Sequence, residues 1–454
     1  MDFRIERDSL GEVRVPKDVY WGPQTQRSHD NFPQNSELMP LELIHALVLV
    51  KKACAEVNFE KNLLDKDRSK LIVKACEKIL SGELDSHFPL TVWQTGSGTQ
   101  SNMNVNEVIS HYGNEIVGTN LLHPNDHVNM SQSSNDTFPT AIHISAAIAI
   151  KNRLIPEIDN AIEVLENLEK ENEGIIKIGR THLQDATPLS FSQEISAWKF
   201  MMIKTKSMIE DSMKYLYKLA IGGTAVGTGL NAPKDFGIRV AAKISEYSSL
   251  PFESSENKFH SLTSHDAIAN AHGALKSLAA DLMKMANDIR WLASGPRCGI
   301  GEINIPANEP GSSIMPSKVN PTQAESLTMI CVQVMSNDIA VGFAASQGNF
   351  QLNVFMPLII YNFLQSVRLL SEGIKHFNSK CLSGLKADRD KMSFNLNNSL
   401  MLVTALAPKI GYDNAAKLAR YAHSNGITLK KASEELSILT AEEFDKYIKP
   451  ENMV

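Results

Sequence analysis

Long seams of apolar residues at helical spacing constrain this chain more than any other feature of its sequence. Between Gly273 and Ala293, apolar side chains recur at alternating intervals of three and four residues, which is the period of one face of an α-helix. A second seam follows Pro188, and a third begins near Pro139 and continues to Leu168, with a kink expected at Pro156. The seam residues are Leu275, Leu278, Leu282, Met285, Ile289 and Leu292 in the first helix, and Ile195, Trp198, Met202, Ile209, Met213 and Leu216 in the second. Because such helices are longer than the average of about 11 to 12 residues, they predict an all-α bundle that continues across a subunit interface.

The remaining organisation is predicted from turn and cap residues. Residues 3–16 alternate around Ser9-Leu10-Gly11 as a small hairpin does, and strand signals nearly vanish after them. The glycine-rich stretch 221–231 follows a helix and has no P-loop lysine, so it predicts a tight helix connection rather than a nucleotide site. Short helices close the chain, and Thr440 caps the last of them. We expect three domains: a mostly helical one at 1–136, a central bundle at 137–388 and a small helical one at 389–454.

Composition excludes several classes of protein. The 454 residues carry a formal charge of −6 without a block of like charges, so neither nucleic acid nor a membrane surface is an expected partner. The five cysteines are widely spaced and form no CxxC pair, which argues against disulfides and zinc and for a reducing compartment. No apolar run reaches the roughly 18 residues of a membrane span. We expect a soluble, cytoplasmic protein.

Two polar segments precede predicted helices and are rich in hydrogen-bond donors. In residues 94–106, glycines allow a ligand to approach the backbone, and Ser97 and Thr99 offer hydroxyls suited to a carboxylate or phosphate. A polar cap and turn is the alternative for this segment. In residues 123–136, the run Ser133, Ser134 and Asn135 lies where a helix N-terminus would attract an anion. His123 and His127 have the spacing of a metal pair, but Pro124 and the lack of a further ligand favour a hydrogen-bonding loop.

Two further segments supply titratable groups. His182 lies in a dense polar setting and is suited to proton transfer, although a lone histidine is more often structural.

In GSSIMPSKVNPT (311–322), Lys318 is a natural counter-ion for a carboxylate and Asn320 is a neutral donor beside it. A serine-hydrolase interpretation fails, because the loop has no GxSxG and an SxxK motif would need serine at position 315. A helix starting after Pro321 would place Glu325 in its first turns, where the carboxylate can pair with a histidine. A capped loop between helices explains the proline but not the concentration of donors.

These segments resemble a known family. TGSGTQSNMNVNE (95–107), GRTHLQDATPLSFSQE (179–194) and GSSIMPSKVNPTQAE (311–325) are similar to the three signature regions of the fumarase/aspartase superfamily. Thr181-His182 and the run Asn320 to Gln323 resemble class II fumarases rather than aspartases. The similarity extends from the N-terminal hairpin to the final PENMV and so covers nearly the whole chain.

The resemblance implies a fold, an assembly and a reaction. It implies an all-α homotetramer whose active sites are each built from three chains, and the reversible hydration of fumarate to L-malate, a step of the tricarboxylic acid cycle, without a metal or organic cofactor. Ser312 matches the catalytic base, and His182, oriented by Glu325, handles the proton of the water. The substrate-binding residues implied are Ser97, Gly98, Thr99, Ser133, Ser134, Asn135, Thr181, Ser313, Lys318 and Asn320, and a second dicarboxylate site near the surface is implied at Asn120, His123, Asn125 and Asp126.

Two positions depart from the family pattern. Ser317 stands where class II fumarases usually have glycine, and Asn120 stands where some members have a basic residue. Two alternatives remain at this point: an aspartate ammonia-lyase of the same superfamily and a catalytically silent helical scaffold.

Overall fold

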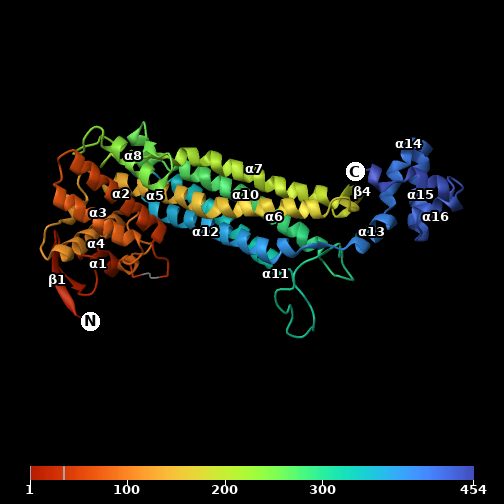
Figure 1. Cartoon of the computed structure of the whole chain (residues 1–454), viewed down its shortest axis with the longest axis horizontal. Coiled ribbons are helices and arrows are strands. Elements are labelled where there is room, and N and C mark those ends of the chain that lie inside the picture. Colours follow the sequence, from red (N-terminus) through yellow and green to blue (C-terminus); the bar gives the residue numbers. More distant parts are fainter. Residues whose placement is uncertain (1, 34–35) are drawn as a thin grey trace. The chain divides into compact units, whose positions relative to one another are not determined.

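The protein is built almost wholly from helices, as the apolar seams predict (Figure 1). The computed structural model describes residues 2–33 and 36–454. The chain forms two compact units, each made of three stretches of sequence. Unit 1 contains residues 1–156, 205–279 and 332–371, and unit 2 contains residues 157–204, 280–331 and 372–454. The division into three domains at 136 and 388 stays a prediction.

Unit 1 holds the predicted N-terminal hairpin and a set of helices. The hairpin is confirmed, and its antiparallel register pairs Phe3 with Pro16 and Asp8 with Gly11. The elements are β1 (Phe3–Asp8), β2 (Gly11–Pro16), α1 (Pro23–Asn31), α2 (Leu41–Glu60), α3 (Lys66–Leu80), η1 (Asp85–His87), α4 (Thr99–Val117), η2 (Pro124–Val128), α5 (Ser134–Ala149), η3 (Ile150–Leu154), β5 (Lys218–Leu219), α8 (Phe236–Ser248), β6 (Glu253–Ser254) and α9 (Lys258–Thr263).

Long helices supply the core that the apolar seams predict. They are α6 (Ile155–Glu171), α7 (Phe191–Leu216), α10 (Asp266–Leu292), α11 (Thr322–Ala345) and α12 (Met356–Lys380). Every seam residue predicted on α7 and α10 is at most 5% exposed. Within unit 2, Trp198 Nε1 of α7 donates to Asp288 Oδ2 of α10 at 3.0 Å. Within unit 1, the buried His272 of α10 bonds Asp338 of α11 and Ser366 of α12. The core is therefore a helix bundle with a few satisfied polar contacts.

The third seam differs from its prediction in where the helix starts. Helix α5 begins at Ser134, five residues before Pro139, because Ser133 and Asp136 form a reciprocal capping box. Pro139 lies inside the helix.

The π-helical turn η3 precedes Pro156, where we expected a kink. Proline has no N–H for the preceding turn, and a π turn is one way a helix accommodates that loss.

Unit 2 contains a hairpin that the sequence interpretation missed. Strands β3 (Ile176–Thr181) and β4 (Gln184–Ser190) pair antiparallel, although strand signals nearly vanish from the sequence after residue 16. A cluster of buried C-terminal residues packs against Ile178 of β3. The other elements are β7 (Ile303–Asn304), η4 (Leu382–Gly384), β8 (Lys386–Ala387), α13 (Arg389–Asn398), η5 (Leu400–Ala405), α14 (Ala407–Ile410), α15 (Tyr412–Asn425), α16 (Leu429–Glu435), α17 (Ala441–Tyr447) and η6 (Pro450–Asn452), with α17 capped by Thr440 as predicted.

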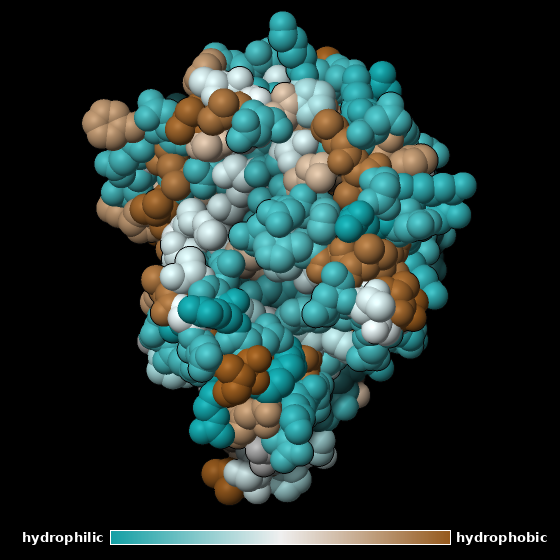
Figure 2. All heavy atoms as spheres, turned by 90° about the vertical axis from the view of Figure 1, so that its left-hand side faces the viewer, coloured by the Kyte–Doolittle hydropathy of each residue, from teal (hydrophilic) through white to brown (hydrophobic). Residues whose placement is uncertain are grey.

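Helix α11 carries an apolar stripe that the chain itself leaves exposed. Met329, Val332, Ile339 and Phe343 are each more than half exposed and share one helical face. In the described residues, α11 is the one helix long and apolar enough to cross a membrane, a test that core helices also pass. On the face shown in Figure 2, by contrast, hydrophilic side chains predominate and hydrophobic ones form small separate patches.

Candidate active site

A chain of hydroxyl groups joins the starts of α4 and α5 in unit 1. Ser97 Oγ lies 2.8 Å from Thr99 Oγ1, which lies 2.8 Å from Ser134 Oγ. Gly98, between them, caps α4 with φ 70°. A Cβ at this position would lie 2.2 Å from the ring of Phe138, so only glycine fits. The structure thus brings together residues that are more than thirty positions apart in sequence.

The predicted anion strip opens α5. Ser133 Oγ accepts from the backbone N–H of Asn135 at 3.2 Å, and Ser134 and Asn135 form the first turn. The side chain of Asn135 donates to the carbonyl of Ala225 at 2.8 Å, which fixes its orientation. The partial positive charge of a helix N-terminus and two hydroxyls therefore face the same position, which suits a carboxylate.

In unit 2, a cavity of about 940 Å³ brings together Lys318, Asn320 and Glu325. Glu325 lies in the first turn of α11, as predicted, and its N–H donates to the carbonyl of Pro321. The cavity is also lined by Asn287, Arg290 and Asn304, which the sequence interpretation missed. No signal marked Asn287 and Arg290, because α10 was identified from its apolar face alone, and Asn304 lies in the two-residue strand β7, which had no pattern of its own.

The loop that carries Ser312 is closed by two hydrogen bonds between its ends, and a third lies within it. The N–H of Gly311 donates to the carbonyl of Lys318 at 2.8 Å, the side chain of Asn320 donates to the carbonyl of Gly311 at 2.7 Å, and the N–H of Lys318 donates to Met315 at 3.4 Å. Ser313, inside the loop, and Lys318, at its end, are exposed. The loop is therefore anchored at its base with its tip in solvent.

Ser312 has a distinctive setting within this loop. Its Oγ accepts two backbone N–H groups, from Ile314 at 3.2 Å and Met315 at 2.9 Å. Consecutive N–H donors that point at one oxygen stabilise negative charge on it. Ser312 thus differs from Ser313, for which no such donors are found in the described residues.

Ser317 lies in the same loop with φ 65°, in the left-handed region that favours glycine. The departure from the family pattern noted in the sequence therefore falls on a position whose backbone conformation suits glycine.

His182 occupies the two-residue turn between β3 and β4. His182 and Leu183 have φ of 57° and 60°, and both side chains are exposed. Two non-glycine residues in this region store strain, which is common at functional sites. Thr181, the last residue of β3, pairs with Gln184 across the turn. Among the described residues of one chain, no hydrogen bond or ion pair joins His182 to Glu325.

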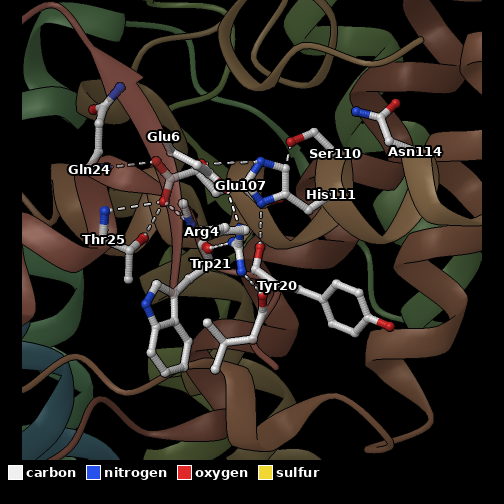
Figure 3. Close-up of polar contacts among 12 residues, drawn as sticks. Arg4, Glu6, Tyr20, Trp21, Gln24, Thr25, Glu107, Ser110, His111 and Asn114 are labelled. Atoms are coloured by element: carbon white, nitrogen blue, oxygen red, sulfur yellow. Dashed lines mark hydrogen bonds and ion pairs between the residues drawn. The ribbon is translucent and has the colours of Figure 1, made fainter. Parts of the chain in front are cut away.

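The predicted second site lies by a cavity of about 630 Å³ in unit 1. Asn120, His123 and Asn125 line it, and Asp126 Oδ2 lies 3.2 Å from His123 Nδ1. Figure 3 shows the wall beside it, where the buried Glu107 accepts from Thr25 and from the backbone N–H groups of Gly22, Gln24 and Thr25. Nearby, His111 Nδ1 contacts the carbonyl of Tyr20. The Glu107 carboxylate is therefore fully occupied by hydrogen bonds within the fold.

Across residues 2–33 and 36–454, no group of three or more His, Cys, Asp or Glu side chains could hold a metal ion. His123 and His127 instead bond to the backbone of their own turn: His127 Nδ1 accepts from the N–H of His123 and His123 Nδ1 from that of Asp126. Their spacing of four therefore closes a turn, as the hydrogen-bonding interpretation expects.

Comparison with known proteins decides the family. A profile of the family described as "Lyase" matches residues 11–336, and one described as "Fumarase C C-terminus" matches residues 402–454. "Fumarate hydratase class II" of Helicobacter pylori is 58% identical over 100% of this chain and 99% of its own, and that of Bacillus subtilis is 56% identical with the same coverage. The chain belongs to the class II fumarate hydratase family.

Solved structures agree with membership of the class II fumarate hydratase family. A crystal structure of recombinant class II fumarase from Schistosoma mansoni matches with a TM-score of 0.97 at 42% identity, over 100% of this chain and 99% of that one. A fumarate lyase:delta crystallin from Brucella melitensis bound to cobalt matches with a TM-score of 0.95 at 37% identity, with the same coverage. The "Lyase" match contains every candidate site residue from Ser97 to Glu325.

Proposed function

We propose that the chain catalyses the reversible hydration of fumarate to L-malate, with Ser312 as the base. The observation that carries this proposal is the pair of backbone N–H groups on Ser312 Oγ. Donors to the charged form of a group lower its pKa, so they ease the removal of the proton from this hydroxyl. The nearby Lys318, in the same loop, adds positive charge.

The proposed reaction is balanced by two proton transfers. In the dehydrating direction, the Ser312 alkoxide takes a proton from C3 of malate, and negative charge moves onto the adjacent carboxylate. The C2–O bond then breaks, and the leaving hydroxyl receives a proton from the imidazolium of His182 and departs as water. Hydration is the reverse sequence, and it uses no metal or organic cofactor.

Binding of the dianion is assigned to the two groups of donors described above. Lys318 and Asn320 would stabilise the carboxylate on which charge accumulates, and this stabilisation is the main catalytic task. Ser97, Gly98 and Thr99 with the Ser133–Asn135 turn would hold the substrate carboxylates, with Thr181 and Ser313 as further contacts.

We infer a homotetramer in which three chains contribute to each site. Support comes from His182, which is exposed and lies apart from Glu325 in the hydrogen-bond network of one chain, and from the exposed apolar stripe of α11. An apolar stripe of this kind suits a bundle shared among copies. The five unpaired cysteines support a reducing compartment, and we propose the cytoplasm.

We further propose that the cavity at Asn120, His123, Asn125 and Asp126 takes a second dicarboxylate. Isothermal calorimetry tests this proposal: malate is titrated into the wild-type protein and into His123→Ala, and the heat of binding gives the number of sites per chain. One binding event per chain in both proteins would remove the second site.

The reaction itself is tested by following the ultraviolet absorbance of fumarate. The purified protein, treated with a chelator, is given L-malate and, separately, L-aspartate. We expect fumarate from malate only. Fumarate from aspartate alone would make the chain an aspartate ammonia-lyase. If neither substrate gives fumarate, the chain is a catalytically silent helical scaffold.

A further inference from the structure

Lys51 of α2 is a fully buried lysine without a carboxylate partner. Its side chain is 0% exposed, and its Nζ donates to Asn129 Oδ1 and to Gln132 Oε1, each at 2.9 Å. Among the described residues, no ion pair includes Lys51. A buried ammonium held by neutral amides is costly, so its presence calls for a reason beyond packing.

The two amides that accept from Lys51 lie under both groups of substrate-binding donors in unit 1. Gln132 is the residue before Ser133, which caps α5. Asn129 Oδ1 also accepts from Asn102 and Asn106 of α4, each at 3.2 Å. Asn102 lies one turn after Thr99, the first residue of that helix. One hydrogen-bond network therefore connects Lys51 to the N-termini of both α4 and α5.

Four charged groups act on one another around this network: Lys51, Lys258, Asp136 and Glu256. Asp136, buried in the first turn of α5, accepts from the N–H groups of Ser133, Gly222 and Thr224. Lys258 is partly buried nearby and donates to the carbonyl of Leu219 and to Ser254 Oγ, not to a carboxylate. Lys51 and Lys258 both act on Asp136, while the exposed Glu256, which pairs with Lys218, also acts on Lys258. The buried Lys51 itself has one carboxylate acting on it, Asp136, behind the Ser133–Asn135 turn.

We infer that Lys51 is a positioning residue for the dicarboxylate: its ammonium sets the two helix N-termini side by side, and its charge attracts the bound dianion without touching it. This inference rests on the proposed function. Charges separated by roughly 10 Å at an effective dielectric constant near 20 interact strongly enough to change binding about tenfold. No mechanism described above uses Lys51.

The charge of Lys51 should be sensitive to pH in a range that can be measured. Burial lowers the pKa of Lys51 to about 8, and the groups that act on it are Cys54 of its own helix, Asp136 of α5 and Cys76 of α3. Burial raises the pKa of both thiols, so they stay neutral in this range. Lys243 of α8, which also packs on α2, is paired with Glu56 and Glu60. The charge of Lys51, and with it the attraction, is therefore present well below pH 8 and is lost progressively as pH rises through about 8.

The test is steady-state fumarate hydration by the full-length protein between pH 6.5 and 9.5. For Lys51→Met at pH 7 we expect KM to rise about tenfold while kcat changes less than about threefold. We expect KM of the wild type to rise above pH 8 and KM of Lys51→Met to stay flat, which a purely structural role would not produce. Lys51→Arg should restore a low KM and remove the rise above pH 8.

A matched control and a second variant complete the experiment. Lys52→Met changes the neighbouring lysine, which pairs with Glu77 at 3.0 Å, and should keep the wild-type KM and pH profile. Asn129→Asp places a carboxylate against Lys51 and should raise KM to a similar degree, even if Lys51→Met fails to fold. An unchanged KM, or a rise above pH 8 that persists in Lys51→Met, would overturn the inference. If the wild type and Lys52→Met are both inactive, the proposed function has failed instead.

Discussion

Arg180 and Glu302 form a bidentate ion pair near the turn of the β3–β4 hairpin, with Nη1–Oε2 and Nη2–Oε1 distances of 2.9 and 2.8 Å. Glu302 is fully buried, and it also lies 3.2 Å from Nζ of the buried Lys177 and accepts from the side chain of Asn395. The hairpin whose turn carries His182 is therefore tied to the interior of unit 2 by one carboxylate.

Replacing that carboxylate should be severely destabilising. Glu302→Gln leaves Arg180 without its carboxylate partner and Lys177 with Glu194 alone, and breaking a buried pair in this way lowers the free energy of unfolding by about 3 to 5 kcal/mol. A urea titration monitored by circular dichroism measures the change. Glu166→Gln removes an exposed partner of Lys170 and should leave the urea midpoint where it is. Equal midpoints for the two variants would contradict this account of Glu302.

The same pair predicts how stability depends on acid. Burial raises the pKa of Glu302, but the hydrogen bond from Arg180 and the charge of Lys177 outweigh it, so the net pKa lies below its usual 4.5. A lowered pKa stabilises the folded state fully above pH 4.5, and the stabilisation is lost as pH falls through the folded-state value. The wild type should lose stability below pH 4.5 more steeply than Glu302→Gln, as measured by urea midpoints from pH 3 to 7.

Ser312→Ala tests the proposed base. It removes the oxygen that accepts from Ile314 and Met315, and we expect kcat to fall at least about 100-fold because proton transfer is lost. Sedimentation should show the same assembly as the wild type. Ser379→Ala, on the exposed side of α12, removes a hydroxyl that bonds its own helix and should retain full activity. Near-normal turnover by Ser312→Ala would remove Ser312 as the base.

Ser317 allows a graded test of loop conformation. At φ 65°, a residue with a Cβ is strained by about 1 to 2 kcal/mol, and β-branching adds to the strain. We expect Ser317→Gly to keep or raise kcat/KM and Ser317→Val to lower it about tenfold. Both are measured by initial rates of fumarate hydration. A valine variant as active as the glycine variant would show that this backbone conformation does not matter for turnover.

The apolar stripe of α11 predicts where assembly would fail. Ile339 is 73% exposed in one chain, and in the proposed tetramer a charge placed there would be buried between copies. Ile339→Asp should therefore give a smaller species by sedimentation at micromolar concentration. Ile238→Asp alters an isoleucine on α8 that is 64% exposed, and this control should remain assembled. Intact assembly of Ile339→Asp would place the interface elsewhere.

Features set by local sequence were predictable. The seam from Leu275 to Leu292 is a periodic pattern that only one helical face explains, and every one of its residues is buried. The N-cap donors at Ser133 and the position of Glu325 follow from short-range rules as well. The apolar seam placed the start of α5 near Pro139, whereas the Ser133 and Asp136 capping box starts the helix at Ser134.

Features set by distant contacts were not predictable. The β3–β4 turn uses His182 and Leu183, where such turns usually show Asn-Gly, so the hairpin gave no signal. Lys51 lies in an apolar helix, where a lysine is ordinarily assumed to extend toward solvent. Its burial depends on Asn129 and Gln132, more than 75 residues away along the chain. Arg290 and Asn287 became candidates only once α10 was placed beside the Lys318 loop.

The exposed face of α11 also has a consequence for how the protein is made. A newly synthesised chain completes this helix with Met329, Val332, Ile339 and Phe343 in water, before any other copy is at hand. At low expression the wait for a partner is long, and the helix is then a target for chaperones and for misassociation with other apolar segments. As expression increases, the amount of active enzyme should therefore rise more steeply than the amount of chain synthesised.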